Sequence, residues 1–338
     1  MSRSHATAAI LLALALLVAG CGGQQGPRAE DASPPAASTS ETAASTGLRV
    51  YTSVTQDTVD AVVAAFESAH PDAEVEVFRA PTGELTARLA AEQRDGEILA
   101  DVLWLTDPLS MQQYAADGLL REWTPAEASA LPREIVEDTF WGTRILNRVV
   151  AQQADLEPAL TTWDDLAGHP YEEPVAIPDP GFAGSAFGAL AYFALDDAFG
   201  FDYYRSVAEA GLVQVKSPGE VVTGVAEGRF SAGMSLDKVV RGAADKGSPI
   251  TLVAPDPGAV AIYSPIAVIA ASTSAFAETF ANFVLTVEAQ EEIAATGWQP
   301  VRDEVEWPHD LPQVFPDWQT AFERREELLE EYRSIVGG

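Results

Sequence analysis

Hydrophobic and polar positions follow two alternating periods along the chain from residue 48 onward. Runs typical of strands begin near residues 48, 73 and 100, and helical spacing fills the segments between them. The first of these helices carries apolar residues at i, i+3, i+4 and i+7, namely Val59, Val62, Val63 and Phe66. This strand–helix order predicts a parallel sheet, and such sheets bind ligands beyond the carboxyl ends of their strands.

A second block with the same mixture of periods occupies residues 146–259. Its expected strands are short and lie at 174–177, 213–215, 230–234 and 250–253. Its expected helices lie at 218–227 and 238–244, with a further one beginning at Ser185. An apolar, β-rich stretch at 259–271 returns toward the first block, and an acidic helix is expected near 321–332. The chain is therefore predicted to be an α/β protein of about two domains.

The first 47 residues differ in composition from the rest. Arg3 and His5 precede an apolar run at 9–19 that is too short to span a bilayer. The small residues ahead of Cys21 resemble a bacterial lipobox, which predicts a signal peptide over 1–20 and a lipid on Cys21; an ordinary signal with a chance cysteine is the alternative. Residues 21–47 have the composition of a disordered tether. We therefore expect a periplasmic or cell-surface protein that contacts the membrane only through its lipid.

Cysteine content and charge exclude several classes of protein. Cys21 is the only cysteine, so an intrachain disulfide and a thiolate metal cluster are excluded. The formal net charge is −31, and the few charges before residue 48 leave −30 on the remainder. Such acidity argues against nucleic acid and against polybasic docking on lipid. Because net charge concerns solubility and steering, it does not make the ligand a cation.

Six short segments together resemble the type 2 periplasmic solute-binding proteins of ABC importers, family 1. The resemblance is to the branch that holds iron(III), phosphonate, thiamine and polyamine receptors, and it covers nearly all of residues 48–302. The segments are Val50-Tyr51-Thr52-Ser53, Ala80-Pro81-Thr82-Gly83-Glu84-Leu85, Asp101-Val102-Leu103-Trp104, Leu160-Thr161-Thr162-Trp163-Asp164-Asp165-Leu166, Ile177-Pro178-Asp179-Pro180 with Gly184-Ser185-Ala186, and Gly297-Trp298-Gln299-Pro300-Val301-Arg302.

This resemblance implies two α/β lobes, each an open and mostly parallel sheet flanked by helices. Crossing strands near 141–149 and 260–268 would join them as a hinge, with lobe 1 formed by 48–145 plus 260–338 and lobe 2 by 146–259. The implied function is capture of a small polar or anionic solute and its delivery to a permease in the cytoplasmic membrane. A monomer without enzymatic activity, cofactor or metal is expected.

Two helix starts are the first candidates for ligand contact. Gly184, Ser185 and Ala186 open a helix after a strand and a turn, where free N–H groups and the helix dipole suit a phosphate, phosphonate or carboxylate. Thr82 and Gly83 form a similar start in the facing lobe. Simple N-capping by Ser185 or Thr82 is the alternative role.

The other candidates lie at strand ends or near the crossings. Thr52 and Ser53 end the first strand and present hydroxyls, although a turn cap is the alternative. Asp107 follows the third strand, but Asp-Pro also opens helices. Asn147 lies near the first crossing, where it could instead cap a loop, and Tyr263 lies in the second crossing.

Asp237 bears on the identity of the ligand. Iron receptors of the resembling branch carry adjacent tyrosines in this segment, whereas this chain reads Met234-Ser235-Leu236-Asp237-Lys238. The pair Tyr203-Tyr204 falls too early and is expected to pack in a helix. An acidic group facing an anion-holding helix start would suit a zwitterion such as an aminoalkylphosphonate. Phosphonate, phosphate ester, iron complex, polyamine and thiamine all remain open.

Other classes of function have weaker support in the sequence. Ser235 and Lys238 match the Ser-x-x-Lys pattern of penicillin-recognising acyl enzymes, but no Lys-Thr-Gly accompanies them. The four histidines are scattered without metal-ligand spacing. A lipoprotein that presents its ligand to a membrane sensor would share the same binding chemistry as an importer receptor.

Overall fold

The computed structural model describes residues 47–132, 137–168 and 171–337. The predicted signal peptide, the lipidation site Cys21 and almost all of the tether lie outside these residues. Residues from Ala43 onward form one compact unit. No helix among the described residues has both the length and the apolar content that a membrane crossing requires.

The first α/β block forms as the periodicity predicts. Strands β1 (Gly47–Thr52), β2 (Glu74–Arg79) and β3 (Val102–Trp104) alternate with helices α1 (Gln56–Ala69) and α2 (Thr82–Asp95). β1 pairs in parallel with both β2 and β3, so the carboxyl ends of all three strands lie at one edge. Helix α3 (Pro108–Ala116) and a short 3-10 helix (Ala128–Ala130) follow.

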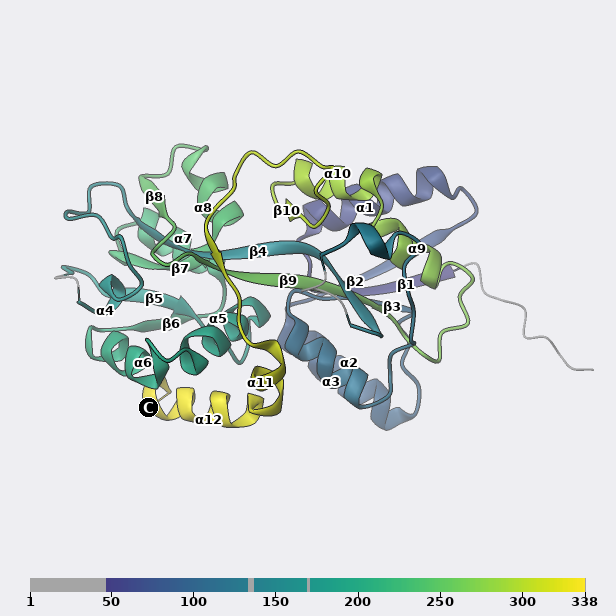
Figure 1. Cartoon of the computed structure of the whole chain (residues 1–338), viewed down its shortest axis with the longest axis horizontal. Coiled ribbons are helices and arrows are strands. Elements are labelled where there is room, and N and C mark those ends of the chain that lie inside the picture. The colour runs from purple at the N-terminus through teal and green to yellow at the C-terminus, as the bar shows by residue number, and fades with distance from the viewer. Residues whose placement is uncertain (1–46, 133–136, 169–170, 338) are drawn as a thin grey trace, which may run out of the picture. The chain divides into compact units, whose positions relative to one another are not determined.

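Two long antiparallel strands connect this block to the second one. They are β4 (Phe140–Gln153) and β9 (Ala259–Val268), which contain the two expected crossings. β9 pairs with β3 of the first lobe, and the far end of β4 pairs with β7 of the second. One sheet with the order β2-β1-β3-β9-β4-β7-β5-β6 therefore runs through both lobes (Figure 1).

Lobe 2 repeats the architecture of lobe 1. Its strands are β5 (Val175–Pro178), β6 (Val213–Val215), β7 (Ala232–Leu236) and β8 (Ile250–Val253). Its helices are α4 (Asp165–Gly168), α5 (Gly184–Leu195), α6 (Gly200–Glu209), α7 (Pro218–Ala226) and α8 (Asp237–Ala244). β5 pairs in parallel with β6 and β7, which again brings strand ends and helix starts to one edge. The α/β fold with two mostly parallel lobes is therefore confirmed.

The segment after β9 contacts both lobes. Helices α9 (Ala277–Val284) and α10 (Val287–Ala295) pack on α1, and the short strands β10 (Gln299–Pro300) and β11 (Gln313–Val314) pair with β4 and β9. The expected acidic helix is two helices, α11 (Trp318–Glu323) and α12 (Arg325–Val336). Whereas the predicted boundaries gave all of 260–338 to lobe 1, α12 packs against α5 and α6 of lobe 2 (Figure 1).

The core of each lobe contains the apolar stripes that the sequence displays. In lobe 1, Phe66 of α1 lies edge-on to Phe280 of α9, with ring centroids 5.0 Å apart. In lobe 2, Val221 and Val240 belong to a separate small core beneath α7 and α8. These cores position the loops that follow the strands, and those loops hold the site.

Candidate functional site: a cationic cavity between the lobes

A cavity of about 340 Å³ lies where loops and strand ends of both lobes meet. On the lobe 1 side, Arg79 is the last residue of β2, whereas Ser53 and Thr106 come just after β1 and β3. Ser185 and Lys216 contribute from α5 and from the end of β6 on the lobe 2 side. The cavity therefore occupies the carboxyl edge at which a ligand of an open α/β sheet is expected.

Two helix N-termini from opposite lobes open at this cavity without a side-chain cap. Helix α2 begins at Thr82 and α5 at Gly184, and neither has a capping hydrogen bond from a side chain. The N–H groups of Thr82, Gly83, Gly184 and Ser185 have no acceptor among the described residues. Pro81 and Ala183 hold the N-cap positions, so the capping role considered for Thr82 and Ser185 is wrong. Free donors at the positive end of a helix dipole favour an oxyanion.

Arg144 is the most unusual group in the cavity wall. It is fully buried, and its Nε, Nη1 and Nη2 atoms have no hydrogen-bond partner among the described residues. A register shift between Gly142 and Ile145 interrupts the pairing of β4 with β9 at this position, and such irregularities redirect side chains. The guanidinium lies 4.4 Å from the ring centroid of Trp298, which holds it by a cation–π contact. Its donors are thus buried and unsatisfied in this conformation.

Burial lowers the pKa of Arg144 to about 9, and the charge of Asp57 opposes part of this shift. Desolvation dominates because no anion lies next to the guanidinium to stabilise its charged form. A charge-assisted bond to an oxyanion would recover about 1.5–3 kcal/mol. The unliganded site is therefore electrostatically unsatisfied.

As far as the described residues go, the cavity lining contains three cations and no carboxylate. Arg79 and Lys216 join Arg144, and Arg79 is fixed by donating from Nε to the carbonyl of Val54 at 2.7 Å. The lining also contains six hydroxyl side chains, those of Ser53, Thr55, Thr82, Thr106, Ser185 and Ser217. A small cation-lined site thus exists in a chain whose formal charge is −31.

A second buried arginine supports this wall from behind. Arg148, also on β4, donates from Nη2 to the Oγ of Ser185 at 3.0 Å. Burial lowers the pKa of Arg148 to about 10. Because a guanidinium only donates, the Ser185 oxygen must accept this bond, and its hydrogen is left for another acceptor. Ser185 therefore faces the cavity as a prospective donor.

Of the residues proposed from sequence, Ser53, Thr82, Gly184 and Ser185 line the cavity. Their role in binding stays a prediction, but the structure brings them together from both lobes.

Three neighbours of these residues lie outside the lining. The Thr52 hydroxyl donates to the carbonyl of Trp104 at 2.6 Å and accepts the N–H of Val54, which is the turn-cap role. Gly83 packs against Phe182 across the lobe boundary. Ala186 lies in the buried first turn of α5, behind the cavity wall.

Asp107 also lies outside the lining, at a contact between the lobes. Its Oδ1 caps α3 by accepting the N–H of Ser110 at 2.8 Å, which is the helix-opening role. A Cβ added to Gly184 would lie 2.1 Å from Oδ2 of Asp107, so only glycine fits there. Burial raises the pKa of this carboxyl.

Asn147 belongs to a buried amide cluster at the crossing. Its Nδ2 donates to Gln299 at 2.8 Å, and its Oδ1 accepts from Gln313 at 2.6 Å. Tyr263 is buried beside Trp318, and its burial raises the pKa of the phenol. Both residues lie outside the lining and secure the hinge strands and the segment after β9.

Asp237 lies outside the cavity lining and pairs within its own helix. The Oδ2 of Asp237 pairs with Arg241 one turn later at 3.0 Å, and Arg241 also donates to the carbonyl of Gly297. Burial raises the pKa of Asp237, although the bond from Arg241 opposes the shift. The structure therefore removes the observation on which the zwitterion hypothesis was based.

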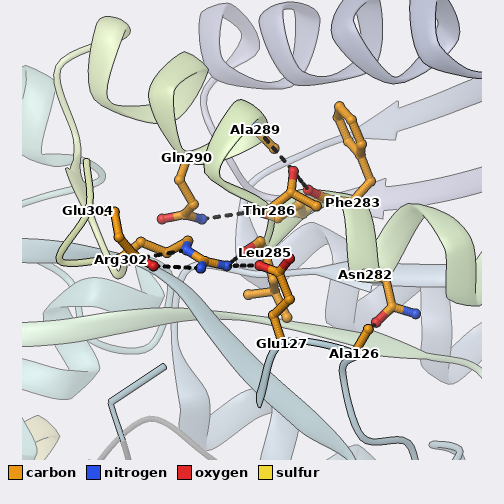
Figure 2. Close-up of polar contacts among 11 residues, drawn as sticks. Ala126, Glu127, Asn282, Phe283, Leu285, Thr286, Ala289, Gln290, Arg302 and Glu304 are labelled. Carbon is orange, nitrogen blue, oxygen red and sulfur yellow. Dashed lines mark hydrogen bonds and ion pairs between the residues drawn. The ribbon is translucent and has the colours of Figure 1, made fainter. Parts of the chain in front are cut away.

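Four further residues of the lining were not predicted from sequence, namely Arg79, Arg144, Lys216 and Trp298. The readable signal for Arg144 was its position, together with Arg148, in an otherwise largely apolar crossing strand. Trp298 belongs to the segment 297–302, one of the six that resemble the solute-binding family. Arg302 of the same segment has a structural role. Figure 2 shows the Arg302 guanidinium held by Glu127, Glu304 and the Leu285 carbonyl.

The described residues contain no group of three or more His, Cys, Asp or Glu that could hold a metal. Tyr203 and Tyr204 are buried in an aromatic cluster, as expected for packing residues. The Ser235 hydroxyl donates to the Pro218 carbonyl, whereas Lys238 pairs with Asp57 of the other lobe.

Two α/β lobes on crossing strands, with a polar cavity between them, define a solute-binding protein. Residues 48–299 match the family of bacterial extracellular solute-binding proteins, and the chain belongs to this family. The resemblance seen in the sequence is thereby confirmed. No curated protein sequence matches the chain at a significant level.

Solved structures share the fold at low sequence identity. The periplasmic binding protein AfuA from Actinobacillus pleuropneumoniae, with exogenous fructose-6-phosphate bound, is 20% identical with a TM-score of 0.76, over 87% of this chain and 99% of that chain. The ferric binding protein from Campylobacter jejuni is 16% identical with a TM-score of 0.74, over 85% and 99%. A substrate-binding protein of an ABC transporter from Agrobacterium tumefaciens is 18% identical with a TM-score of 0.75, over 88% and 96%.

Proposed function

We propose that this protein captures a small solute bearing a phosphate, phosphonate or similar oxyanion between its lobes and delivers it to the permease of an ABC importer. The observation that carries the proposal is the buried Arg144, whose guanidinium has no hydrogen-bond partner among the described residues and borders a cavity whose described lining contains no carboxylate. An oxyanion there would meet this guanidinium and the free N–H groups of α2 and α5.

Closure of the lobes is part of the proposed capture. Asp57 of α1 pairs with Lys238 of α8, and Arg241 of α8 donates to the carbonyl of Gly297 at 3.0 Å. These contacts join the lobes at one side of the cavity, and the contact of Asp107 with Gly184 joins them elsewhere. A ligand contacted by both lobes favours the closed state by its differential affinity.

Cationic solutes and ferric iron have less support than an oxyanion. Spermidine, thiamine and Fe³⁺ would enter a cavity with three cationic side chains and no acidic one. Ferric iron also requires hard anionic ligands, and the adjacent tyrosines of the resembling iron receptors are absent from the segment around Asp237. AfuA, whose solved structure contains fructose-6-phosphate, is a structural neighbour whose bound ligand has the chemistry proposed here.

The first experiment identifies the ligand class without prior choice. Protein purified without denaturation is examined by native mass spectrometry for a retained small mass. Thermal shift is then measured with propylphosphonate, glycerol 3-phosphate, spermidine, thiamine and ferric citrate. We expect stabilisation by the phosphonate or the phosphate ester. Stabilisation by ferric citrate alone would refute the proposal.

The lipid on Cys21 and the extracytoplasmic location are part of the same proposal. The variant Cys21→Ala is expected to lose incorporated palmitate and to leave the membrane fraction, whereas Ser4→Ala in the same leader should not. Retention of Cys21→Ala in the membrane fraction after a carbonate wash would contradict lipid anchoring.

A further inference from the structure

We infer that the captured anion carries no positive charge elsewhere: the cavity selects an organic phosphate or phosphonate and rejects its amino-substituted counterpart. This inference rests on the proposed function and names the solute class that the same cavity takes. It reverses the aminoalkylphosphonate hypothesis drawn from the sequence.

The charges of the cavity wall all have one sign. Arg79, Arg144 and Lys216 line it, and the free ends of α2 and α5 add the positive poles of two helix dipoles. No Asp or Glu lies in the lining. An ammonium group on the ligand would therefore meet repulsion and hydroxyl dipoles, with no carboxylate to pair with.

Three carboxylates outside the lining each bond to another group of the protein, and so does Glu220, which accepts the backbone N–H of Lys216 at 3.2 Å. Asp57 pairs with Lys238, and Asp237 pairs with Arg241 at 3.0 Å. Asp107, the third, lies behind Gly184 and caps α3. Oδ2 of Asp107 and Oδ1 of Asp237 have no hydrogen-bond partner among the described residues, but neither residue belongs to the cavity lining.

The rest of the wall is suited to an uncharged body. Beyond the charged and hydroxyl groups, apolar side chains line the cavity: Pro81, Leu146, Phe182, Pro218, Leu236 and Val239. The volume of about 340 Å³ falls at the lower end of the range for small-molecule sites, about 300–1,000 Å³. The cavity thus has room for a short organic group beside the oxyanion. Moving an unpaired ammonium from water to such a surface is strongly unfavourable.

The test compares two compounds that differ in one group at the chain end. Propylphosphonate ends in a methyl group where 2-aminoethylphosphonate ends in an ammonium group. Isothermal titration of the purified mature protein is expected to give a dissociation constant at least about 30-fold higher for the amino compound, since one uncompensated charge costs 2 kcal/mol or more. Equal or tighter binding of 2-aminoethylphosphonate would overturn the inference and leave the proposed function standing. Binding of neither compound would overturn the inference, and the proposed function as well if glycerol 3-phosphate also fails to stabilise the protein.

A new carboxylate in the cavity should change the preference. Val239 lines the cavity, so Val239→Asp places an anion beside the ligand. The affinity ratio of propylphosphonate to 2-aminoethylphosphonate is expected to fall at least tenfold in this variant. Val213 is exposed on β6 and outside the lining, and Val213→Asp should leave the ratio unchanged. An unchanged ratio in Val239→Asp would count against the inference.

A second pair of variants guards against misfolding of the first. Lys216→Glu reverses a charge of the lining at an exposed position, and Lys246→Glu makes the same change outside the lining. The affinity ratio should fall in Lys216→Glu and stay constant in Lys246→Glu. A ratio that responds equally to both substitutions would show that net charge, rather than the cavity, sets the preference.

Discussion

Replacing Arg144 by methionine should stabilise the unliganded protein while it abolishes tight binding. The pKa of Arg144 falls to about 9 on burial, which corresponds to roughly 5 kcal/mol of unfavourable free energy at neutral pH, at about 1.4 kcal/mol per pKa unit. Loss of the contact with Trp298 offsets about 2 kcal/mol of that gain. A net stabilisation of about 3 kcal/mol would raise Tm by about 6 °C.

The same substitution removes the donors that the proposed ligand needs. Two charge-assisted hydrogen bonds at about 1.5–3 kcal/mol each give an expected loss of at least 100-fold in affinity for propylphosphonate. Opposite effects on stability and on binding distinguish a ligand-binding arginine from a structural one. A structural arginine would lower stability when it is removed.

The pH dependence of stability tests the effect of the buried Arg144 charge independently. The folded protein releases the Arg144 proton at lower pH than the unfolded chain does, so the unfolded chain binds more protons above about pH 9. The Arg144→Met variant should therefore exceed the wild type in free energy of unfolding by less and less as pH rises above about 9. Below that pH the advantage of the variant should be constant.

The assay is urea unfolding of unliganded protein at pH 7.5 and pH 10, with isothermal titration at pH 7.5. The control is Arg49→Met on the exposed edge of lobe 1, where an exposed pair with Glu76 contributes about 1 kcal/mol or less. A less stable Arg144→Met protein, or one that binds propylphosphonate like the wild type, would refute the reasoning.

Two further predictions concern the lobe contact and the support of the cavity wall. Gly184→Ala places a Cβ 2.1 Å from Oδ2 of Asp107, so we expect a folded protein that closes poorly, binds propylphosphonate at least tenfold more weakly and has a larger radius of gyration by small-angle scattering with ligand. Gly242→Ala, whose Cβ would meet no neighbour within 4 Å, is its control; equal binding by both variants would contradict the lobe contact. Ser185→Ala and Arg148→Lys should each weaken binding several-fold, and the double variant should bind no more weakly than Ser185→Ala, because both act through one hydroxyl. Additive losses in titration calorimetry would show that Arg148 acts by another route.

Local sequence patterns predicted the secondary-structure elements better than they predicted the tertiary contacts between them. The three strands of lobe 1 and the helix starts at 82 and 184 follow from period and punctuation, which are local properties, whereas the crossing near 141–149 was predicted from the family resemblance. Helix α12 was assigned to lobe 1 because the chain returns there through β9. Its packing on α5 and α6 depends on surfaces that meet only after folding.

The hydrogen-bond partners of polar residues near the crossing strands were equally hard to predict from local sequence. Asn147 bonds to Gln299 and Gln313, more than 150 residues away in sequence, and no local pattern reveals such partners. Asp237 differs, because Arg241 lies one helical turn later and an i,i+4 pair is readable from the sequence. Reading that pair would have removed Asp237 from the candidate ligand contacts.

The sequence by itself determined the α/β class, the family resemblance, the two helix starts and the distribution of charge along the chain. It could not determine the sign of charge in the cavity, because that depends on which side chains meet there. The tertiary structure brings Arg79, Arg144 and Lys216 together and ties the neighbouring carboxylates to other partners. A chain of net charge −31 thus presents a cationic cavity, since surface charge is set by composition and site charge by packing.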